Sequence, residues 1–317
     1  MKIVQRWVVL SFFVISNSFF VPTCFAGVGA DAADFLRITP DSHVAALGNS
    51  GVANGDTDFS LYHNPALLSQ TKNRYRLAGA QTQWLLGLQA SHYTASLAWS
   101  FRGGNPWGMG VFVSEWHKSF NATDPFGNPA GRGDYRARNA GIALSHAVLP
   151  TFSLGVTVKR LSQSFGEQGF SSQRNRISAS LPAWDAGVAW RTPWKDVVMA
   201  AAYRNVGSKT SFGRQEERLP TSAHAGAQGR FLGEGFSWSL EAMGNREKAK
   251  ALGGGLGFSP FPGFTLRAGY NTLYNGKDYG GFTSGLGFYF KSFRLDCSFV
   301  PLGPLGSVQR FSMSWRS

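Results

Sequence analysis

The sequence is poor in charge, in cysteine and in long apolar runs, and each shortage excludes a class of protein. Charged residues make up only 15% of the 317 residues, against roughly 25% in soluble domains. After the N-terminus there is no run of about 18 apolar residues, which disfavours a helical membrane protein. The cysteines are Cys24 and Cys297. Removal of a leader would leave only Cys297, so we expect neither an intrachain disulfide nor a cysteine-based metal site.

Enzyme signatures are missing as well. The sequence contains no G-x-S-x-G, H-E-x-x-H or P-loop motif, and its histidines have no ligand spacing. We therefore expect no enzyme, no cofactor and no bound metal. The glycine run at 253–257 lies in a strand pattern and indicates close strand packing. One alternative stays open, because some barrel lipases use a Ser-His pair to which His92 or His146 could correspond. A plain lumen-lining histidine is the simpler interpretation of both.

The sequence does contain strict alternation of apolar and polar residues, and it is cleanest from Ser91 to Phe101. One side carries Tyr93, Ala95, Leu97, Trp99 and Phe101, and the other carries His92, Thr94, Ser96, Ala98 and Ser100. A period of two residues predicts a β-strand with one apolar face.

The same pattern recurs along the chain and predicts fourteen strands. Their expected cores are residues 74–82, 91–101, 107–117, 136–147, 152–165, 176–191, 197–205, 222–230, 236–243, 251–258, 264–271, 282–290, 293–299 and 308–316.

The connections between these segments alternate in length. Every second one is short, whereas residues 118–135, 206–221 and 272–280 form longer polar connections. Short turns at one end, long loops at the other and an even strand count are typical of outer-membrane barrels, with both chain ends in the periplasm. We therefore predict an all-β fold, a transmembrane antiparallel β-barrel of about 14 strands. A soluble β-sandwich is the alternative, but it gives no reason for all tight turns to lie at one end.

A membrane barrel of this size fixes the two faces of each strand. The apolar side meets lipid and the polar side lines the lumen, past His92, Thr94 and Ser96. Tryptophan and tyrosine side chains concentrate where a membrane meets water. We assign to these girdles Trp107, Trp116, Trp184, Trp190, Tyr270 and Trp315.

The chain before the first strand divides into two parts. Residues 1–26 have a basic start, an apolar core and small residues before Ala26, and predict a signal peptide for export. Residues 27–73 are too few for a core of their own and too apolar for a solvated tail. We predict that they form a plug, or hatch, inside a barrel built from residues 74–317. A periplasmic extension docked on a partner is the alternative.

The formal net charge is +13. Because the basic residues are scattered, contact with anionic outer-membrane lipid or a cationic lumen is favoured over nucleic acid. Five basic residues point inward by alternation and are candidates for binding an anionic headgroup. They are Lys159, Arg191, Arg204, Arg267 and Arg294. The alternative is that they pair with inward carboxylates at Asp185, Glu241 and Asp296 and stiffen the barrel.

Several segments resemble the long-chain fatty-acid transporter (FadL-like) superfamily of outer-membrane barrels, in its PorV/PorQ-type branch. The matching segments are Ala45-Ala46-Leu47-Gly48 with Asp58, Asn64-Pro65-Ala66, residues 154–161, residues 204–207 with Leu219-Pro220, and residues 285–315. The resemblance implies a fourteen-stranded barrel with an N-terminal hatch in the bacterial cell outer membrane.

The resemblance implies two functions. The first is passive uptake of hydrophobic or amphipathic small molecules such as long-chain fatty acids, with a path opened by movement of the plug around Asn64, Pro65 and Ala66. The second is a PorV-type shuttle or scaffold that contacts secretion-machinery proteins and does not conduct. Binding of a labelled fatty acid would favour the first, and co-purification of secreted cargo would favour the second.

Overall fold

The computed structural model describes residues 33–101, 104–123, 129–169, 174–194, 196–212, 215–232, 235–245, 250–272, 281–302 and 306–317. The predicted signal peptide and most of the predicted connection at 272–280 lie outside these residues.

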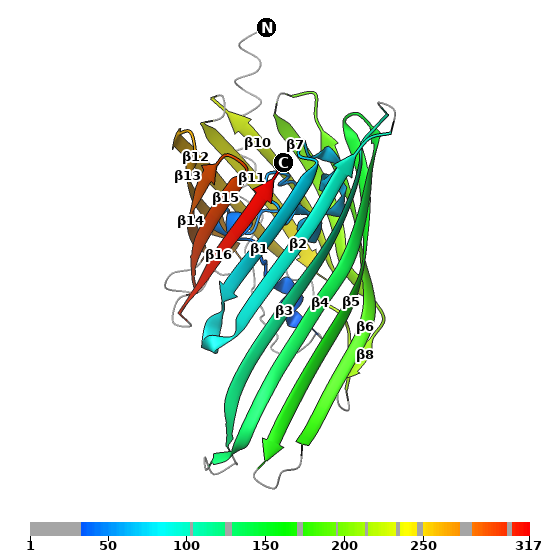
Figure 1. The fold of residues 1–317 in the computed structure, drawn as a ribbon, viewed down its shortest axis with the longest axis vertical. Helices are drawn as coiled ribbons and strands as arrows, with labels where there is room; N and C mark the ends of the chain where they lie inside the picture. The colour runs from blue at the N-terminus through cyan, green and yellow to red at the C-terminus, as the bar shows by residue number, and fades with distance from the viewer. Residues whose placement is uncertain are drawn as a thin grey trace.

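Fourteen strands form a closed antiparallel barrel, as the sequence predicted (Figure 1). They are β1 (Tyr75–Gln83), β2 (Gln89–Trp99), β3 (Trp107–Thr123), β4 (Pro129–Leu149), β5 (Phe152–Gly169), β6 (Arg174–Arg191), β7 (Val197–Gly207), β10 (Ser222–Phe231), β11 (Phe236–Asn245), β12 (Lys250–Phe261), β13 (Phe264–Asn271), β14 (Phe282–Phe290), β15 (Phe293–Pro301) and β16 (Ser307–Arg316). The ring closes where β1 pairs with β16, from Arg76 opposite Arg316 to Gln83 opposite Gln309. Closure gives every strand of the ring a partner on both sides, although β3 continues past its pairing with β2, which ends at His117.

The barrel has two unlike ends. The turn end carries the start of β1, the end of β16 and connections as short as Pro262-Gly263 and Lys291-Ser292. The loop end carries the connection between β7 and β10, which includes a small two-stranded sheet of β8 (Thr210–Phe212) and β9 (Gln215–Glu217).

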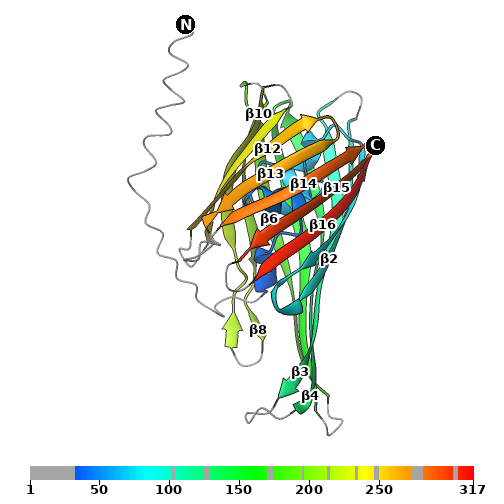
Figure 2. The same cartoon turned by 90° about the vertical axis from the view of Figure 1, so that its left-hand side faces the viewer.

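Four neighbouring strands are much longer than the rest and extend beyond the loop end (Figures 1 and 2). β3, β4, β5 and β6 have 17, 21, 18 and 18 residues, whereas a transmembrane strand needs about 9–11. The predicted loop at 118–135 is therefore wrong, because β3 continues to Thr123 and β4 begins at Pro129. The apolar–polar alternation stops near Lys118 because a hairpin outside the lipid layer has no need of an apolar face.

The outer surface of the strands is apolar, as the alternation predicted, with Tyr93, Val158, Leu240 and Met313 among its exposed side chains. Near the turn end, aromatic rings of adjacent strands stack in a row. Ring centroids are 5.2 Å apart between Phe231 and Phe236 and 4.8 Å apart between Phe236 and Phe258. Such an outer band suits the hydrocarbon and interfacial layers of a bilayer.

The assignment of Trp116 to the interfacial girdle is wrong. Its side chain is buried inside the barrel and only 2% exposed. On β3 the inward side chains are Phe112, Ser114 and Trp116, whereas Glu115 between them points out and is exposed. The ring of Trp116 packs against Phe35, with centroids 6.5 Å apart. The rule that large aromatics face lipid fails here because the lumen itself is partly apolar.

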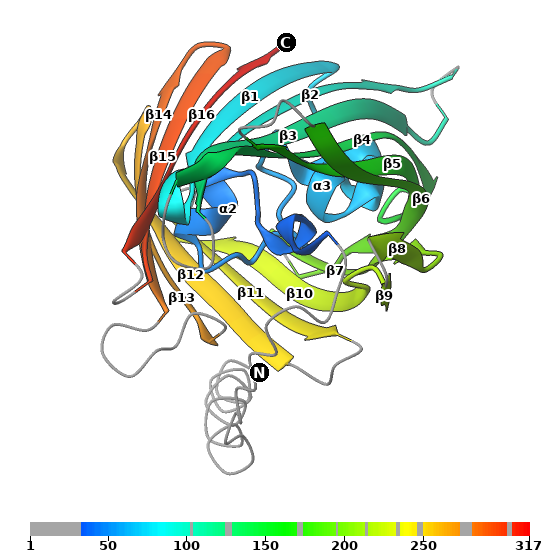
Figure 3. The ribbon, with the colours of Figure 1, turned by 90° about the horizontal axis from the view of Figure 1, so that it is seen from below.

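Residues 33–73 lie within the ring of strands and form four short helices (Figure 3). These are η2 (Asp34–Arg37), α2 (Ser42–Ala46), α3 (Ser60–His63) and η3 (Pro65–Gln70), and a further single turn, η4 (Leu85–Gly87), joins β1 to β2. α2 packs against β13–β16, and η3 packs against β2–β6. Within the described residues, no helix is long and apolar enough to cross a membrane.

Candidate functional site

Asn64 fixes the N-terminal segment to the barrel wall. Its Nδ2 donates to the backbone oxygens of Val52 and Val188, each at 3.0 Å, and so joins a residue of the segment to one of β6. Its Oδ1 accepts from the backbone N–H of Ala66 at 3.0 Å and caps η3, which has Pro65 at its first position. Each half of the amide is thus used. The motif predicted as a gate is held on both sides.

Where this motif contacts the barrel wall, β5 and β6 present the glycines Gly155 and Gly187. A Cβ placed on Gly187 would lie 2.0 Å from Asn64 Oδ1, and one on Gly155 would lie 2.3 Å from the backbone nitrogen of Ala66. Next to them, Ser153 Oγ donates to the backbone oxygen of Ala66 at 2.9 Å. Glycine is needed here because the segment approaches the backbone of β5 and β6 too closely for any side chain.

A second glycine-to-backbone contact holds the segment on the opposite wall. Gly48 donates its N–H to Thr283 Oγ1 at 3.0 Å and accepts from Asn271 Nδ2 at 2.6 Å. A Cβ on Gly253 would lie 2.2 Å from Gly48 O, and one on Gly269 would lie 2.4 Å from Gly48 N. The inward glycines of the 253–257 run therefore make room for the N-terminal segment, in addition to the strand packing that the sequence indicated.

Two of the predicted headgroup residues, Arg267 and Arg294, share one carboxylate. Arg267 Nη1 lies 2.8 Å from Asp296 Oδ1, and Arg294 binds the other oxygen of Asp296 through Nε. Arg294 also donates to the backbone oxygen of Asp56 at 2.6 Å and to His43 Nδ1. Burial, then the charges of Arg267 and Arg294, lower the pKa of His43 well below its ordinary value, so the neutral ring can accept this bond. The group ties α2 and residue 56 to β13 and β15.

A third predicted residue, Lys159, forms a separate buried ion pair. Its Nζ lies 2.7 Å from Asp185 Oδ1 and 2.6 Å from Asn205 Oδ1. Asp185 also accepts from the backbone N–H of Asn205 at 2.6 Å. The group links β5, β6 and β7. Together with the Asp296 group it supports the alternative that inward charges satisfy one another.

The remaining two candidates lie apart from these groups. The guanidinium of Arg204 stands 5.4 Å from the ring centroid of Tyr62 in α3. Arg191 is exposed at the turn end, where its Nη2 donates to the backbone oxygen of Gln70 at 3.2 Å. The five predicted residues therefore do not converge on one point. Headgroup binding by any of them stays a prediction.

The lumen also holds an apolar cluster that inward alternation did not reveal. It combines side chains from η2, β2–β6 and Leu219. Its buried members are Ala33, Phe35, Leu36, Ala90, Trp116, Ala137, Leu161, Leu181, Ala183 and Leu219. In a smaller cluster, Leu61, Tyr62 and Leu68 of the N-terminal segment pack against Phe112 and Ala143 of the wall. The sequence did contain one sign that these two rings point inward. On β3, Trp116 and Phe112 lie on the same side of the strand as Gly108, Gly110 and Ser114, which is the side that faces the lumen.

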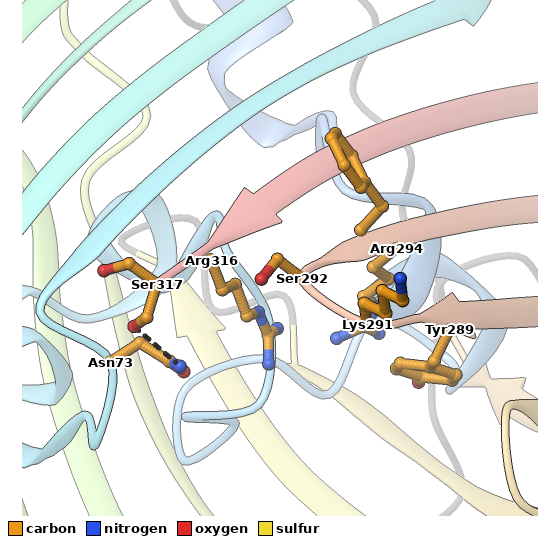
Figure 4. A pocket seen from close by; sticks show the side chains of 8 residues that line it. Asn73, Tyr289, Lys291, Ser292, Arg294, Arg316 and Ser317 are labelled. Atoms are coloured by element: carbon orange, nitrogen blue, oxygen red, sulfur yellow. Dashed lines mark hydrogen bonds between the residues drawn. The ribbon is translucent and has the colours of Figure 1, made fainter.

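A polar pocket of about 310 Å³ opens at the turn end between β14, β15 and the end of β16 (Figure 4). Its lining includes Lys291, Arg294 and Arg316 and contains no acidic side chain. Arg316 is already bound to Asp58 Oδ1 at 2.7 Å, and Arg294 to Asp296, so much of this charge is compensated.

Comparison with known proteins places this architecture. No family model and no curated protein matches the sequence. The toluene transporter TbuX of Ralstonia pickettii superimposes with a TM-score of 0.59 at 13% identity, covering 88% of this chain and 98% of that one. A FadL homologue of Pseudomonas aeruginosa gives 0.59 at 14% identity, with 87% and 98% covered. The chain shares their fold. The CymD monoaromatic hydrocarbon channel agrees, at 0.59 and 12% identity, with 93% and 99% covered.

The shared fold does not by itself assign a role to any single residue of this chain. At these identities the likeness shows the architecture alone, so the roles of Asn64, Lys159 and the arginines rest on their contacts in this chain. At the level of the fold, the neighbours agree with the FadL-like part of the predicted resemblance. The PorV/PorQ branch stays a prediction.

Proposed function

We propose that the protein is a passive outer-membrane channel for hydrophobic or amphipathic small molecules. The observation that carries the proposal is the apolar cluster around Trp116, which lies inside the barrel and not on its lipid face. A channel that conducts only water or ions has a polar interior, whereas Phe35, Leu161 and Leu181 give this lumen an apolar region of the kind that binds small hydrophobic molecules. The structural neighbours include a toluene transporter and a monoaromatic hydrocarbon channel, which supports the same class of solute.

The proposed path starts at the loop end, beside the long strands β3–β6. A solute leaves the outer leaflet or the medium and enters the apolar cluster, where it already meets Phe35 and Leu36 of the N-terminal segment. The rest of residues 33–73 then stops it. Its exit toward the turn end requires movement of the segment held at Asn64-Pro65-Ala66, which acts as the plug. Long-chain fatty acids are one candidate solute, with Arg267 or Arg294 near the carboxylate.

Uptake into porin-deficient bacteria tests this function. Cells that produce the protein should accumulate radiolabelled hydrophobic solutes, among them dodecanoate and toluene, several times faster than cells with an empty vector. A Trp116→Asp variant should lose most of this gain, because an unpaired buried carboxylate disfavours apolar contents. Glu115→Gln, on the outer face of the same strand, is the matched control and should transport normally. Equal uptake with and without the protein would reject the channel, and co-purified secretion cargo would then select the shuttle.

A further inference from the structure

A row of polar side chains crosses the apolar part of the lumen. At one level of the wall, β1 to β6 contribute Ala80, His92, Ser114, Asn139, Leu161 and Leu181, each paired with the next across the sheet. All of them are buried, with His92 and Asn139 only 1% exposed. Three adjacent strands therefore present an imidazole, a hydroxyl and an amide side by side, in a row that is otherwise alanine and leucine.

This row lies between two inward aromatic rings of β3. Trp116 is two residues from Ser114 toward the loop end, and its ring meets the edge of His92 with centroids 5.5 Å apart. Phe112 is two residues toward the turn end and meets Tyr62 of α3 at 6.0 Å. The three polar side chains thus lie between Trp116, which belongs to one apolar cluster, and Phe112, which belongs to the cluster beside α3, directly on the proposed path.

Within the part of the chain that the structure describes, the side chains of His92 and Asn139 have no hydrogen-bond partner. Both ring nitrogens of His92 and both amide atoms of Asn139 are buried and unbonded. Buried polar atoms are nearly always satisfied, because leaving them unpaired costs stability. The amide of Asn64 keeps this rule, because it uses both its oxygen and its nitrogen. Some other buried side chains, such as Ser298 and Thr157, leave a single hydroxyl unbonded, whereas His92 and Asn139 each leave both of their polar atoms unbonded. Two unpaired side chains, with one strand between them, mark a place where a guest molecule supplies the bonds.

The geometry points to a subsite, formed by His92, Ser114 and Asn139, for the hydroxyl group of an otherwise apolar solute. Each of these side chains can both donate and accept a hydrogen bond. A hydroxyl does the same, whereas a hydrocarbon does neither and a carboxylate only accepts. The aromatic rings above and below the row accommodate the apolar remainder of the solute. The inference rests on the proposed function and narrows it to neutral alcohols or phenols.

Binding of three molecules of equal chain length tests the subsite. The full chain in lipid nanodiscs is equilibrated with radiolabelled dodecane, 1-dodecanol or dodecanoate, and uptake by empty nanodiscs is subtracted. We expect 1-dodecanol to bind about tenfold more tightly than dodecane, the factor for one ordinary hydrogen bond. The double variant His92→Leu/Asn139→Leu should lose this preference and keep its affinity for dodecane. Ser298→Ala removes a buried, unbonded hydroxyl on β15, and this control should keep the preference.

A second measurement on the unaltered chain keeps the test independent of variant folding. With ¹⁵N-labelled histidine, 1-dodecanol should shift the ring nitrogens of one histidine, and dodecane should not. Equal binding of dodecane and 1-dodecanol would overturn the inference and leave the channel standing. Preferred binding of dodecanoate would overturn it in favour of the arginines. If none of the three binds, the proposed function fails, and the subsite fails with it.

Discussion

A Gly155→Ala/Gly187→Ala variant should release the Asn64-Pro65-Ala66 turn from the barrel wall. At Gly155 the new Cβ would meet the backbone nitrogen of Ala66 at 2.3 Å, which no side-chain rotation can relieve. At Gly187 it would meet Asn64 Oδ1 at 2.0 Å and break the cap of η3. Overpacking of this kind costs roughly 1–3 kcal/mol, so amide exchange in residues 60–70 should accelerate by about 10- to 100-fold. The barrel strands should keep their protection because no strand pairing changes.

Hydrogen exchange followed by mass spectrometry measures this directly, and ion leakage through a planar bilayer measures its consequence. If residues 33–73 act as the plug, the variant should leak more than the unaltered chain. Gly244→Ala is the matched control, since a Cβ there meets no atom within 4 Å. Unchanged exchange in residues 60–70 would show that the wall does not hold the segment through these glycines. Faster exchange without leakage would show that the segment is held there but does not close the path.

The barrel itself was predictable because alternation reports directly on a strand with two different environments. The pattern in β2 is confirmed from Gln89 to Thr94, with Tyr93 exposed and His92 buried, whereas the remaining residues of the strand, 95–99, are all half-buried. Where both environments are alike the signal disappears, as in the protruding part of β3 and β4 beyond Lys118. It also misleads where the lumen is apolar, since Trp116 looks like a lipid-facing residue until its parity with Ser114 is considered. Alternation gives the side of a strand and leaves open what occupies the lumen.

The contacts that hold the N-terminal segment could not be predicted from the sequence, for a different reason. Asn64-Pro65-Ala66 could be recognised as a motif, but its partners Gly155 and Gly187 are distant in the chain, and no local pattern connects them. The same holds for Gly48 with Gly253 and Gly269. The partners of the inward basic residues could not be predicted from the sequence either. Inward parity placed Lys159, Arg267 and Arg294 correctly in the lumen. Only the register of β5 with β6, and of β14 with both β13 and β15, shows that carboxylates lie within reach.

Removal of the Lys159 ammonium should strongly destabilise the barrel, because it leaves a buried carboxylate without its cation. In a Lys159→Met variant, Asp185 keeps its backbone bond to Asn205 but loses the cation at 2.7 Å. Leaving one member of a buried ion pair alone costs on the order of 3–5 kcal/mol. The effect should appear as a lower denaturant midpoint of unfolding in lipid vesicles, and as a lower temperature at which the folded band is lost in a heat-modifiability gel.

Removing the stranded charge supplies the control for this experiment. Lys159→Met/Asp185→Asn takes away both charges and keeps the side-chain volumes similar, so it should recover most of the stability that the single variant loses. Such a recovery identifies the unpaired carboxylate, and not the lost lysine stem, as the cause. A single variant as stable as the unaltered chain would mean that water replaces the ammonium at no cost. Lys159 would then be available to a solute carboxylate, which is one of the two roles that the sequence left open for it.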